Sequence, residues 1–199
     1  MYKLCKTELS AKRQREAERV FLSMIETVGY EAISVSEICR MAQMPRKAFY
    51  RYFDTKEDVA LSLIDHTLAG YDDYVQSKTQ TQGRTVASEL ESFFSFWQQG
   101  DARRVLVAIM KNGLEGRLIQ RSISFSVSEM PSIRRFMSSD SKGAEEHIFR
   151  FVITGLMSVM LSWFKGGCVE SSREMSRIVQ RLVAEPIFPN LKTYGIEKD

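Results

Sequence analysis

The sequence SVSEICRMAQMPRKAFYRYFDTKED, residues 34–58, decides the fold of the N-terminal region. It begins with a capping box, in which the Ser34 hydroxyl can accept a hydrogen bond from the Glu37 amide while the Glu37 side chain reaches back. Pro45 suits the first turn of the next helix, because its missing N–H would have no partner there. A longer helix starts at residues 55–58. The stretch therefore predicts two short helices joined by about four residues, followed by a third helix.

Another helix precedes this stretch. Between residues 10 and 28 the apolar side chains recur at helical spacing and form one stripe. They are Val20, Phe21, Met24, Ile25 and Val28. Gly29 follows, at a place where helix ends favour glycine. Three short helices of this size predict a helix-turn-helix unit, in which the second helix of the pair lies in the major groove of DNA.

The helix after Pro45 leaves a surface suited to reading DNA. Phe49 and Phe53 share its inner face, and cations and phenols remain outside. An arginine fork matches guanine O6 and N7, and the helix N-termini near Ser34 and Thr55 offer amides to phosphate. The predicted DNA-contacting residues are Ser34, Ser36, Arg46, Lys47, Ala48, Tyr50, Arg51, Tyr52 and Lys56. The alternative is a three-helix folding unit with ordinary solvated charges.

The distribution of charge agrees with a nucleic-acid-binding head. Residues 1–56 hold eleven Lys/Arg and seven Asp/Glu, whereas residues 57–199 hold seventeen and eighteen. A basic segment on a near-neutral remainder suits contact with phosphates, although ordinary solvated charge would give the same count.

The run Ser34–Asp58 resembles the DNA-binding domain of TetR/AcrR-type transcriptional regulators, and the resemblance extends over about residues 10–65. Its most specific part is FYRYFDTKE, residues 49–57. The remainder is similar to the helical regulatory domain of that family. Trp163 and Gly166, followed by a second capping box at residues 171–174, are similar to a subgroup common in Firmicutes. The resemblance implies a homodimer that binds a palindromic operator, usually as a repressor released by a small-molecule effector. The three cysteines are odd in number and lack Cys-x-x-Cys spacing, which favours a reducing cytoplasm.

Three positions depart from the family pattern. Gln43 stands where the family usually has glycine, so we expect a helical or otherwise unstrained backbone there. Pro45 replaces a serine whose hydroxyl and amide often contact phosphate, and Lys47 replaces a small residue. These changes leave the fold intact and alter the expected operator contacts.

The rest of the chain is also predicted to be helical. Residues 122–128 (SISFSVS) alternate with period two, but a single strand could not complete its hydrogen-bond ladder, so we expect a helix from about Leu114. Another helix is expected to open at Asp140 or Ser141 and to close at residues 165–167. The prediction is an all-α fold of about nine helices. It divides into a helix-turn-helix domain, residues 1–55, and a C-terminal helical bundle for effector binding and dimerisation, residues 56–199.

Two clusters in the bundle are candidate sites. The predicted ligand pocket consists of Phe93, Phe96, Trp97, Met110 and Phe125. Aromatic and apolar side chains line most small-molecule sites, but the same residues could be plain core. The predicted dimer interface consists of Val152, Leu156, Met160, Trp163, Ile178, Val179 and Leu182. Two late apolar stripes suit a four-helix interface, and an intramolecular core is the alternative.

Other functions lack a sequence signal. The sequence has no Gly-x-Ser-x-Gly, P-loop or His-Glu-x-x-His motif, so we expect no enzyme and no cofactor. His66 and His147 lack companions at metal-ligand spacing, so no metal is expected. The N-terminus lacks a signal-peptide pattern, and the apolar window 151–164 is shorter than a membrane span, so no membrane partner is expected.

The alternative function is a helical ligand-binding or protein-interaction module with a non-functional helix-turn-helix.

Overall fold

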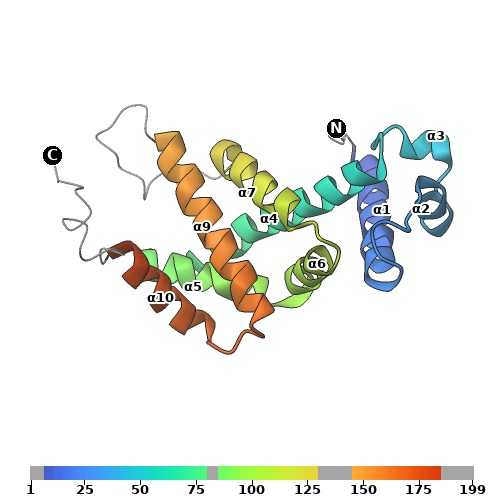
Figure 1. Cartoon of the computed structure of the whole chain (residues 1–199). Helices are drawn as coiled ribbons and strands as arrows, with labels where there is room; N and C mark the ends of the chain where they lie inside the picture. Colours follow the sequence, from blue (N-terminus) through green and yellow to red (C-terminus); the bar gives the residue numbers. More distant parts are fainter. Residues whose placement is uncertain (1–6, 80–84, 130–144, 185–199) are drawn as a thin grey trace.

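The computed structural model describes residues 7–79, 85–129 and 145–184, and within these ranges it contains helices and no strands (Figure 1). The helices are α1 (Glu8–Thr27), α2 (Val35–Met41), α3 (Arg46–Phe49), α4 (Lys56–Thr79), α5 (Val86–Trp97), α6 (Gly100–Lys111), α7 (Glu115–Glu129), α9 (Glu145–Lys165) and α10 (Ser172–Ala184). The predicted all-α class is confirmed, and the described ranges hold nine helices. The helix expected from Asp140 or Ser141 begins outside the described residues.

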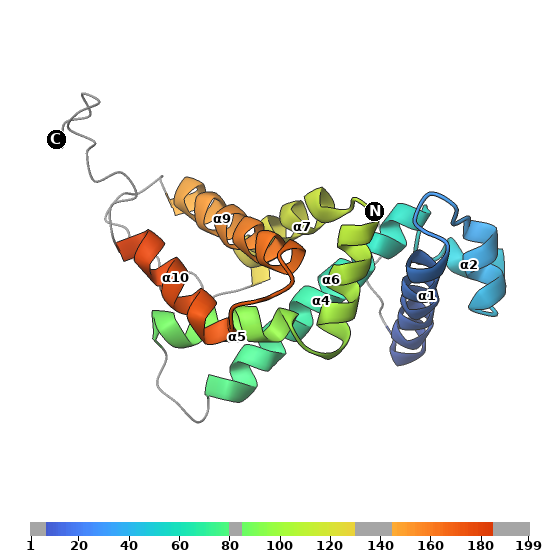
Figure 2. The same ribbon diagram turned by 60° about the horizontal axis from the view of Figure 1, so that its bottom comes forward.

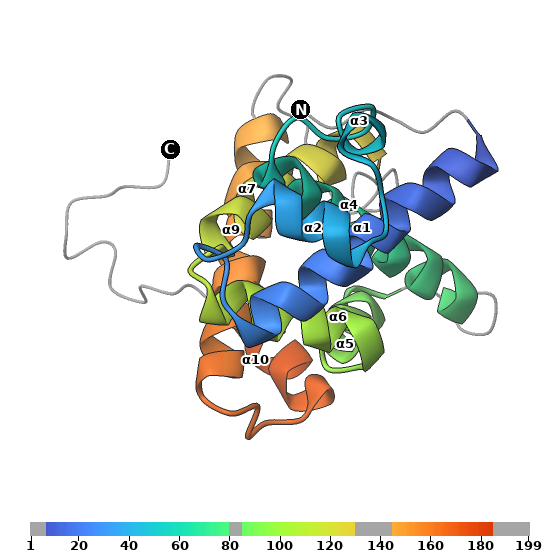
Figure 3. The same cartoon turned by 90° about the vertical axis from the view of Figure 1, so that its right-hand side faces the viewer.

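The long helix α4 connects two groups of helices. Helices α1–α3, which we call the head, gather at its N-terminal end, and α5–α10 surround the rest of it, so we call α4–α10 the body (Figures 1 and 2). Figure 3 looks onto the head, with α1 and α2 in front of the body. Within the body, α10 packs on α5, and α7 packs on both α4 and α9.

The buried apolar side chains form one continuous cluster from head to body. Phe21 of α1 and Phe49 of α3 are fully buried, as are Ile64 of α4 and Leu106 of α6, and all four belong to this cluster. Burying such side chains is the main stabilising contribution to a helical protein of this size. The boundary expected between residues 55 and 56 stays a prediction, because α4 begins there and packs against α1 as well as the body.

Local sequence signals set the helix ends in the head. The Ser34 hydroxyl accepts a hydrogen bond from the Glu37 amide, 3.3 Å, and the Ser34 amide donates to the Glu37 carboxylate, 2.9 Å, so the predicted capping box is confirmed. The Ser34 hydroxyl also donates to the Glu37 carboxylate, 2.7 Å, and this bond and the one from the Ser34 amide lower the pKa of Glu37 because they stabilise its charged form. Gly29 has φ +83° directly after α1, as expected for a glycine at a helix end.

The turn between α2 and α3 differs from the expectation for Gln43, which has φ +48°. The Met44 amide donates to the Cys39 carbonyl, 2.9 Å, and the Gln43 amide donates to the Arg40 carbonyl, 3.3 Å. This pair of bonds is the Schellman arrangement, which places the residue after the cap in the left-handed region. The expectation of an unstrained backbone was therefore wrong. Pro45 lies one place before the first turn, as the N-cap of α3.

The serine-rich segment 122–128 lies within α7, so the helix expected there is confirmed. The Ser122 hydroxyl donates to the Leu118 carbonyl, 2.8 Å, and Ser124 does the same to Gln120, 3.1 Å. A serine whose hydroxyl donates to a carbonyl of the preceding turn can occupy a helix. The period-two pattern therefore came from serine spacing and not from a sheet.

The apolar stretch of α9 is longer than the window 151–164 indicated. The span 146–165 contains an 18-residue window with a mean hydropathy of 1.4 and is long enough to cross a membrane, a property that core helices of soluble proteins share. Phe149, Met157 and Met160 are buried against the other helices. Gly167, with φ +85°, ends the helix near the expected position.

Candidate functional site

Helix α3 presents an exposed basic surface. Arg46, Lys47, Tyr50 and Arg51 are exposed, as are Ser34 and Ser36 at the start of α2. The Arg46 guanidinium donates to the Ser36 hydroxyl, which links the N-terminal ends of the two helices. Lys47 and Arg51 form no ion pair among the described residues. Six of the nine predicted residues are thus exposed, and Ser36 is in a position to orient Arg46.

Two residues of the predicted DNA-contacting set lie in the core of the head. Ala48 and Tyr52 are each 8% exposed. The Tyr52 ring packs edge-on against Phe53, with the centroids 6.4 Å apart. Their side chains support the helix from inside and offer little surface to a partner.

Lys56 is engaged within the protein. Its ammonium donates to the carbonyls of Tyr30, 2.9 Å, and Glu31, 3.2 Å, and lies 4.5 Å from the centre of the Tyr30 ring. The neighbouring amide of Thr55 donates to the Asp58 carboxylate, 3.1 Å. The structure therefore ties the start of α4 to the turn after α1, and the cation and amide that the sequence assigned to phosphate already have partners.

The structure adds Arg13 to this surface. A cavity of about 340 Å³ at the α2–α3 turn brings Arg13 of α1 together with Lys47 and Arg51, and Glu16 also lines it. Glu16 is bound to Arg19, 2.6 Å away. The basic pair at residues 12–13 was visible in the sequence, but only the packing of α1 against the turn places it beside α3.

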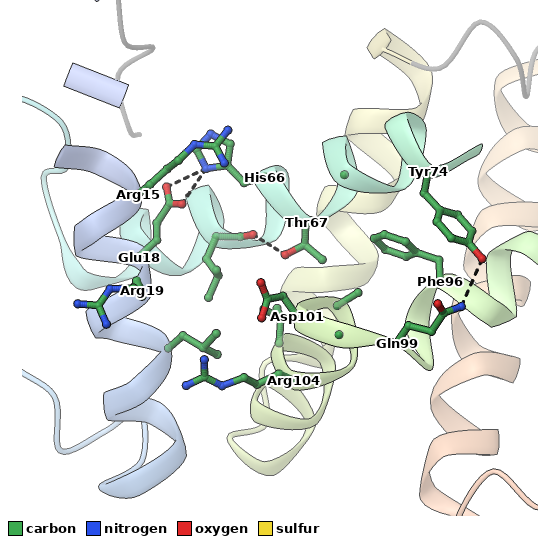
Figure 4. A pocket seen from close by; sticks show the side chains of 16 residues that line it. Arg15, Glu18, Arg19, His66, Thr67, Tyr74, Phe96, Gln99, Asp101 and Arg104 are labelled. Atoms are coloured by element: carbon green, nitrogen blue, oxygen red, sulfur yellow. Dashed lines mark hydrogen bonds and ion pairs between the residues drawn. The ribbon is translucent and has the colours of Figure 1, made fainter. Parts of the chain in front are cut away.

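The five residues of the predicted ligand pocket do not line one cavity. Trp97 is buried in the core, and Phe93, Met110 and Phe125 pack half-buried against that core. Phe96 lines a cavity of about 550 Å³, and the other four are absent from its wall. The cavity lies between α1, α4, the end of α5 and the start of α6 (Figure 4).

This cavity has an apolar wall with a polar edge. Its lining residues are Arg15, Glu18, Arg19, Leu22, Leu63, His66, Thr67, Gly70, Tyr74, Phe96, Gln99, Gly100, Asp101, Ala102, Arg104 and Val105. At the edge, the buried carboxylate of Glu18 accepts from the Ser62 hydroxyl, 2.5 Å, and lies 2.8 Å from Nδ1 of His66. The Ser62 hydroxyl also accepts from Gln14, 2.7 Å. These bonds hold α1 against α4.

Hydrogen bonds and an ion pair also fasten the head to α6. The Asn112 side chain accepts from the Tyr30 amide, 2.6 Å, and donates to the Ile25 carbonyl, 3.1 Å. Arg104 of α6 binds Glu26 of α1 through two bonds of 2.7 and 2.6 Å. These contacts couple the end of α1 to the position of α6.

Two further ion pairs join α7 to α4. Arg117 binds Glu57, 2.7 Å, and Arg121 binds Asp65 through two hydrogen bonds. The hydrogen bond from Arg117 lowers the pKa of Glu57 and raises that of Arg117. The N-terminal half of α4 is thereby held by both the head and the body.

The predicted dimer residues divide by burial. Met160, Trp163 and Val179 are buried within the chain, and the Trp163 indole donates to the Glu170 carbonyl, 3.2 Å. Val152 and Leu156 are half-buried. Ile178 and Leu182 are 42% and 45% exposed. The structure also exposes two apolar side chains that the sequence analysis did not select, Ile148 and Phe151 of α9.

Comparisons with known proteins agree with this architecture. A sequence model described as "Bacterial regulatory proteins, tetR family" matches residues 22–63. The transcriptional regulator EthR of Mycolicibacterium smegmatis is 36% identical over 76 residues, which are 36% of this chain and 35% of EthR. The chain therefore aligns with about a third of the length of that relative.

Solved structures share the fold over most of the chain. A TetR-family regulator from Syntrophomonas wolfei has a TM-score of 0.62 at 13% identity, covering 90% of this chain and 98% of that one. FadR of Thermus thermophilus, a TetR-family repressor solved with lauroyl-CoA, has a TM-score of 0.51 at 18% identity, covering 87% and 94%. The helix-turn-helix region thus matches the tetR family of bacterial regulatory proteins in sequence, and the whole arrangement is similar in fold to a TetR-family regulator.

Proposed function

We propose that this protein binds operator DNA as a homodimer and regulates transcription, as a repressor released by a small-molecule effector. One observation carries the proposal, the exposed basic surface of α3 in a head matched to a family of bacterial regulators. Lys47 and Arg51 have no carboxylate partner among the described residues, so their charges remain available to phosphate. Arg46, held by Ser36, suits a guanine edge in the major groove.

A second copy of the chain is the proposed partner of the exposed apolar side chains on α9 and α10. Ile148 and Phe151 lie on α9, and Ile178 and Leu182 on α10. A two-fold dimer through this face would bury them and would present two heads to DNA. Two such heads fit half-sites about one helical turn, 34–36 Å, or a multiple of it apart, so the operator should be a palindrome. Binding to chromosomal DNA would place the protein in the cytoplasm.

The effector signal is proposed to reach the head through α4 and α6. Asn112 and Arg104 join α6 to α1, and Lys56 joins α4 to the turn after α1. A ligand that favours another position of these helices would change the distance between the two heads and weaken operator binding. Coupling of this kind between two sites typically amounts to about 1–3 kcal/mol.

The test is a titration of the purified protein with labelled duplex DNA from the region upstream of its own gene. We expect dimeric protein, preference over a scrambled duplex, and an affinity that falls steeply with added salt. A chain that stays monomeric and binds no duplex at low ionic strength would contradict the proposal. That result would instead favour a helical interaction module with a non-functional helix-turn-helix.

A further inference from the structure

The cavity between α1, α4 and α6 has the form of a small-molecule site. Its volume of about 550 Å³ falls within the range of known ligand pockets. Leu22, Leu63 and Val105 supply apolar wall from three different helices. Gly70 of α4 also lines it, and a Cβ placed on this glycine would meet no atom within 4 Å. The cavity therefore has an apolar interior with room for a hydrocarbon chain.

One cation of the lining has no carboxylate partner. Arg19 is paired with Glu16, and Arg104 with Glu26, both at 2.6 Å. Arg15 makes no ion pair among the described residues. In Figure 4 its side chain extends from α1 toward His66, and Tyr74 and Phe96 lie at the opposite end of the cavity. The lining thus has a cationic end and an aromatic end.

The acidic lining residues do not neutralise Arg15. Glu18 is occupied by the Ser62 hydroxyl and by His66. Asp101 lies in the first turn of α6, where a carboxylate is favoured by the helix dipole. In Figure 4 it lies apart from the Arg15 end. An anionic group beside Arg15 would find a cation that is not already paired.

We propose that this cavity binds a medium-chain carboxylic acid, with the carboxylate on Arg15 and the alkyl chain along Leu63 and Gly70 toward Phe96. This site shares only Phe96 with the aromatic cluster predicted from the sequence as a pocket. The proposal deepens the proposed function, on which it rests only for its effect on DNA. Because the cavity lies between α1 of the head and α4 and α6 of the body, the bound acid would favour one relative position of the two.

Calorimetric titration of the full-length protein with octanoate tests the site, and 1-octanol serves as the uncharged probe of equal chain length. We expect octanoate to bind and 1-octanol to bind about tenfold or more weakly, because the alcohol cannot form a charge-assisted bond with Arg15. Equal affinity for the two probes, or no binding of octanoate, would overturn the proposal.

Two variants locate the bound molecule. Arg15→Gln is expected to lower the affinity for octanoate about tenfold or more and to leave the affinity for 1-octanol unchanged. Lys111→Gln, at another exposed cation, is the control and should change neither affinity. Gly70→Leu fills the cavity and should abolish binding of both probes. Gly116→Leu, at a glycine of α7 that also has open space around it, should leave binding unchanged. Unaltered octanoate binding by Arg15→Gln or by a folded Gly70→Leu variant would refute the assignment.

The DNA measurement is kept separate from the binding measurement. If octanoate binds and the apo-protein binds duplex DNA, octanoate should change the operator affinity of the wild type but not that of Gly70→Leu. If the protein binds no DNA, the proposed function fails, while calorimetry still decides whether the cavity holds the acid. If octanoate does not bind, the cavity assignment fails and the DNA titration is unaffected.

Discussion

Basic side chains on α3 and the turn after it have surroundings opposite to those of basic side chains at the junction of head and body. Lys47 and Arg51 are exposed and form no ion pair among the described residues. At the junction, Lys56 binds two backbone carbonyls, and Arg104 and Arg117 bind carboxylates. A phosphate could reach the first pair directly, whereas at the junction it would have to displace an existing partner. The same residue types are thus available to an outside partner in one region and serve internal cohesion in the other.

The largest expected effect of a substitution at the junction belongs to Asn112. Its side chain bonds the Tyr30 amide and the carbonyls of Ile25 and Ala108. Asn112→Ala leaves these partly buried groups unpaired, so we expect the free energy of unfolding to fall by about 3 kcal/mol. Urea denaturation measures the change. Lys111→Ala, one residue away and exposed, should cost less than about 0.5 kcal/mol, and equal costs for the two variants would contradict the role given to Asn112.

On α3 the largest expected effect is on DNA specificity. Arg46→Ala should lose about 1–3 kcal/mol of discrimination between operator and scrambled duplex, because a guanine edge loses its partner. Arg51→Gln should lower the affinity for both duplexes alike and reduce the slope of log K against log salt by about 1. Anisotropy titrations at several salt concentrations separate the two outcomes. Identical changes in the two variants would show that Arg46 does not read bases.

Ser36→Ala sharpens the same test. The Ser36 hydroxyl accepts from Arg46 and has no charge of its own. If it orients the guanidinium, its loss should reduce specificity in the same direction as Arg46→Ala but by less, about 0.5–1.5 kcal/mol. A change in non-specific affinity alone would point instead to a phosphate contact by Ser36.

The sequence predicted the features of the head that depend on near neighbours. The capping box at Ser34, the glycine after α1 and the inward faces of Phe49 and Phe53 all follow from spacings of a few residues, and the structure agrees with each. The family resemblance over residues 10–65 is confirmed by the match at residues 22–63. Short-range signals carry this information because caps and helical faces involve residues close in the chain.

Partners distant in sequence escaped prediction. The bonds from Lys56 to Tyr30 and Glu31 join residues 26 and 25 positions apart. The bonds of Asn112 to Ile25 and Tyr30 join residues more than 80 positions apart. No periodicity encodes such pairs. The cavity was missed for the same reason, since its wall takes residues from α1, α4 and α6, whereas the aromatic spacing on α5 drew attention to the core. Gln43 shows that a turn can require left-handed backbone without glycine.

A smaller effect is expected at Lys56, which the sequence alone had placed among the DNA-contacting residues. Lys56→Met removes two hydrogen bonds from a partly buried ammonium to Tyr30 and Glu31 but keeps the aliphatic packing. We now expect the free energy of unfolding to fall by about 1–2 kcal/mol. The affinity of the folded protein for DNA and its salt slope should not change. A reduced slope of log K against log salt, as expected for Arg51→Gln, would show that Lys56 contacts DNA phosphate.

The smallest expected effect concerns acid stability at the junction. The Arg117 hydrogen bond holds the pKa of Glu57 below its ordinary value in the folded state. A depressed folded-state pKa contributes stability that is fully present above the unfolded pKa, about 4.3, and is lost as pH falls through the folded value. Both side chains are partly exposed, so the contribution should not exceed about 1 kcal/mol.

Glu57→Gln tests this contribution by urea denaturation above and below that pH. The variant should lose less stability on acidification than the wild type, and Arg117→Gln should match it, because either change removes the pair. The acid dependence should not vanish, since the pKa values of Glu16 and Glu37 are also lowered, by bonds from Arg19 and Ser34. If Glu57→Gln kept the full acid dependence, the ion pair would contribute nothing to cohesion, and Lys56 and Asn112 would hold the junction without it.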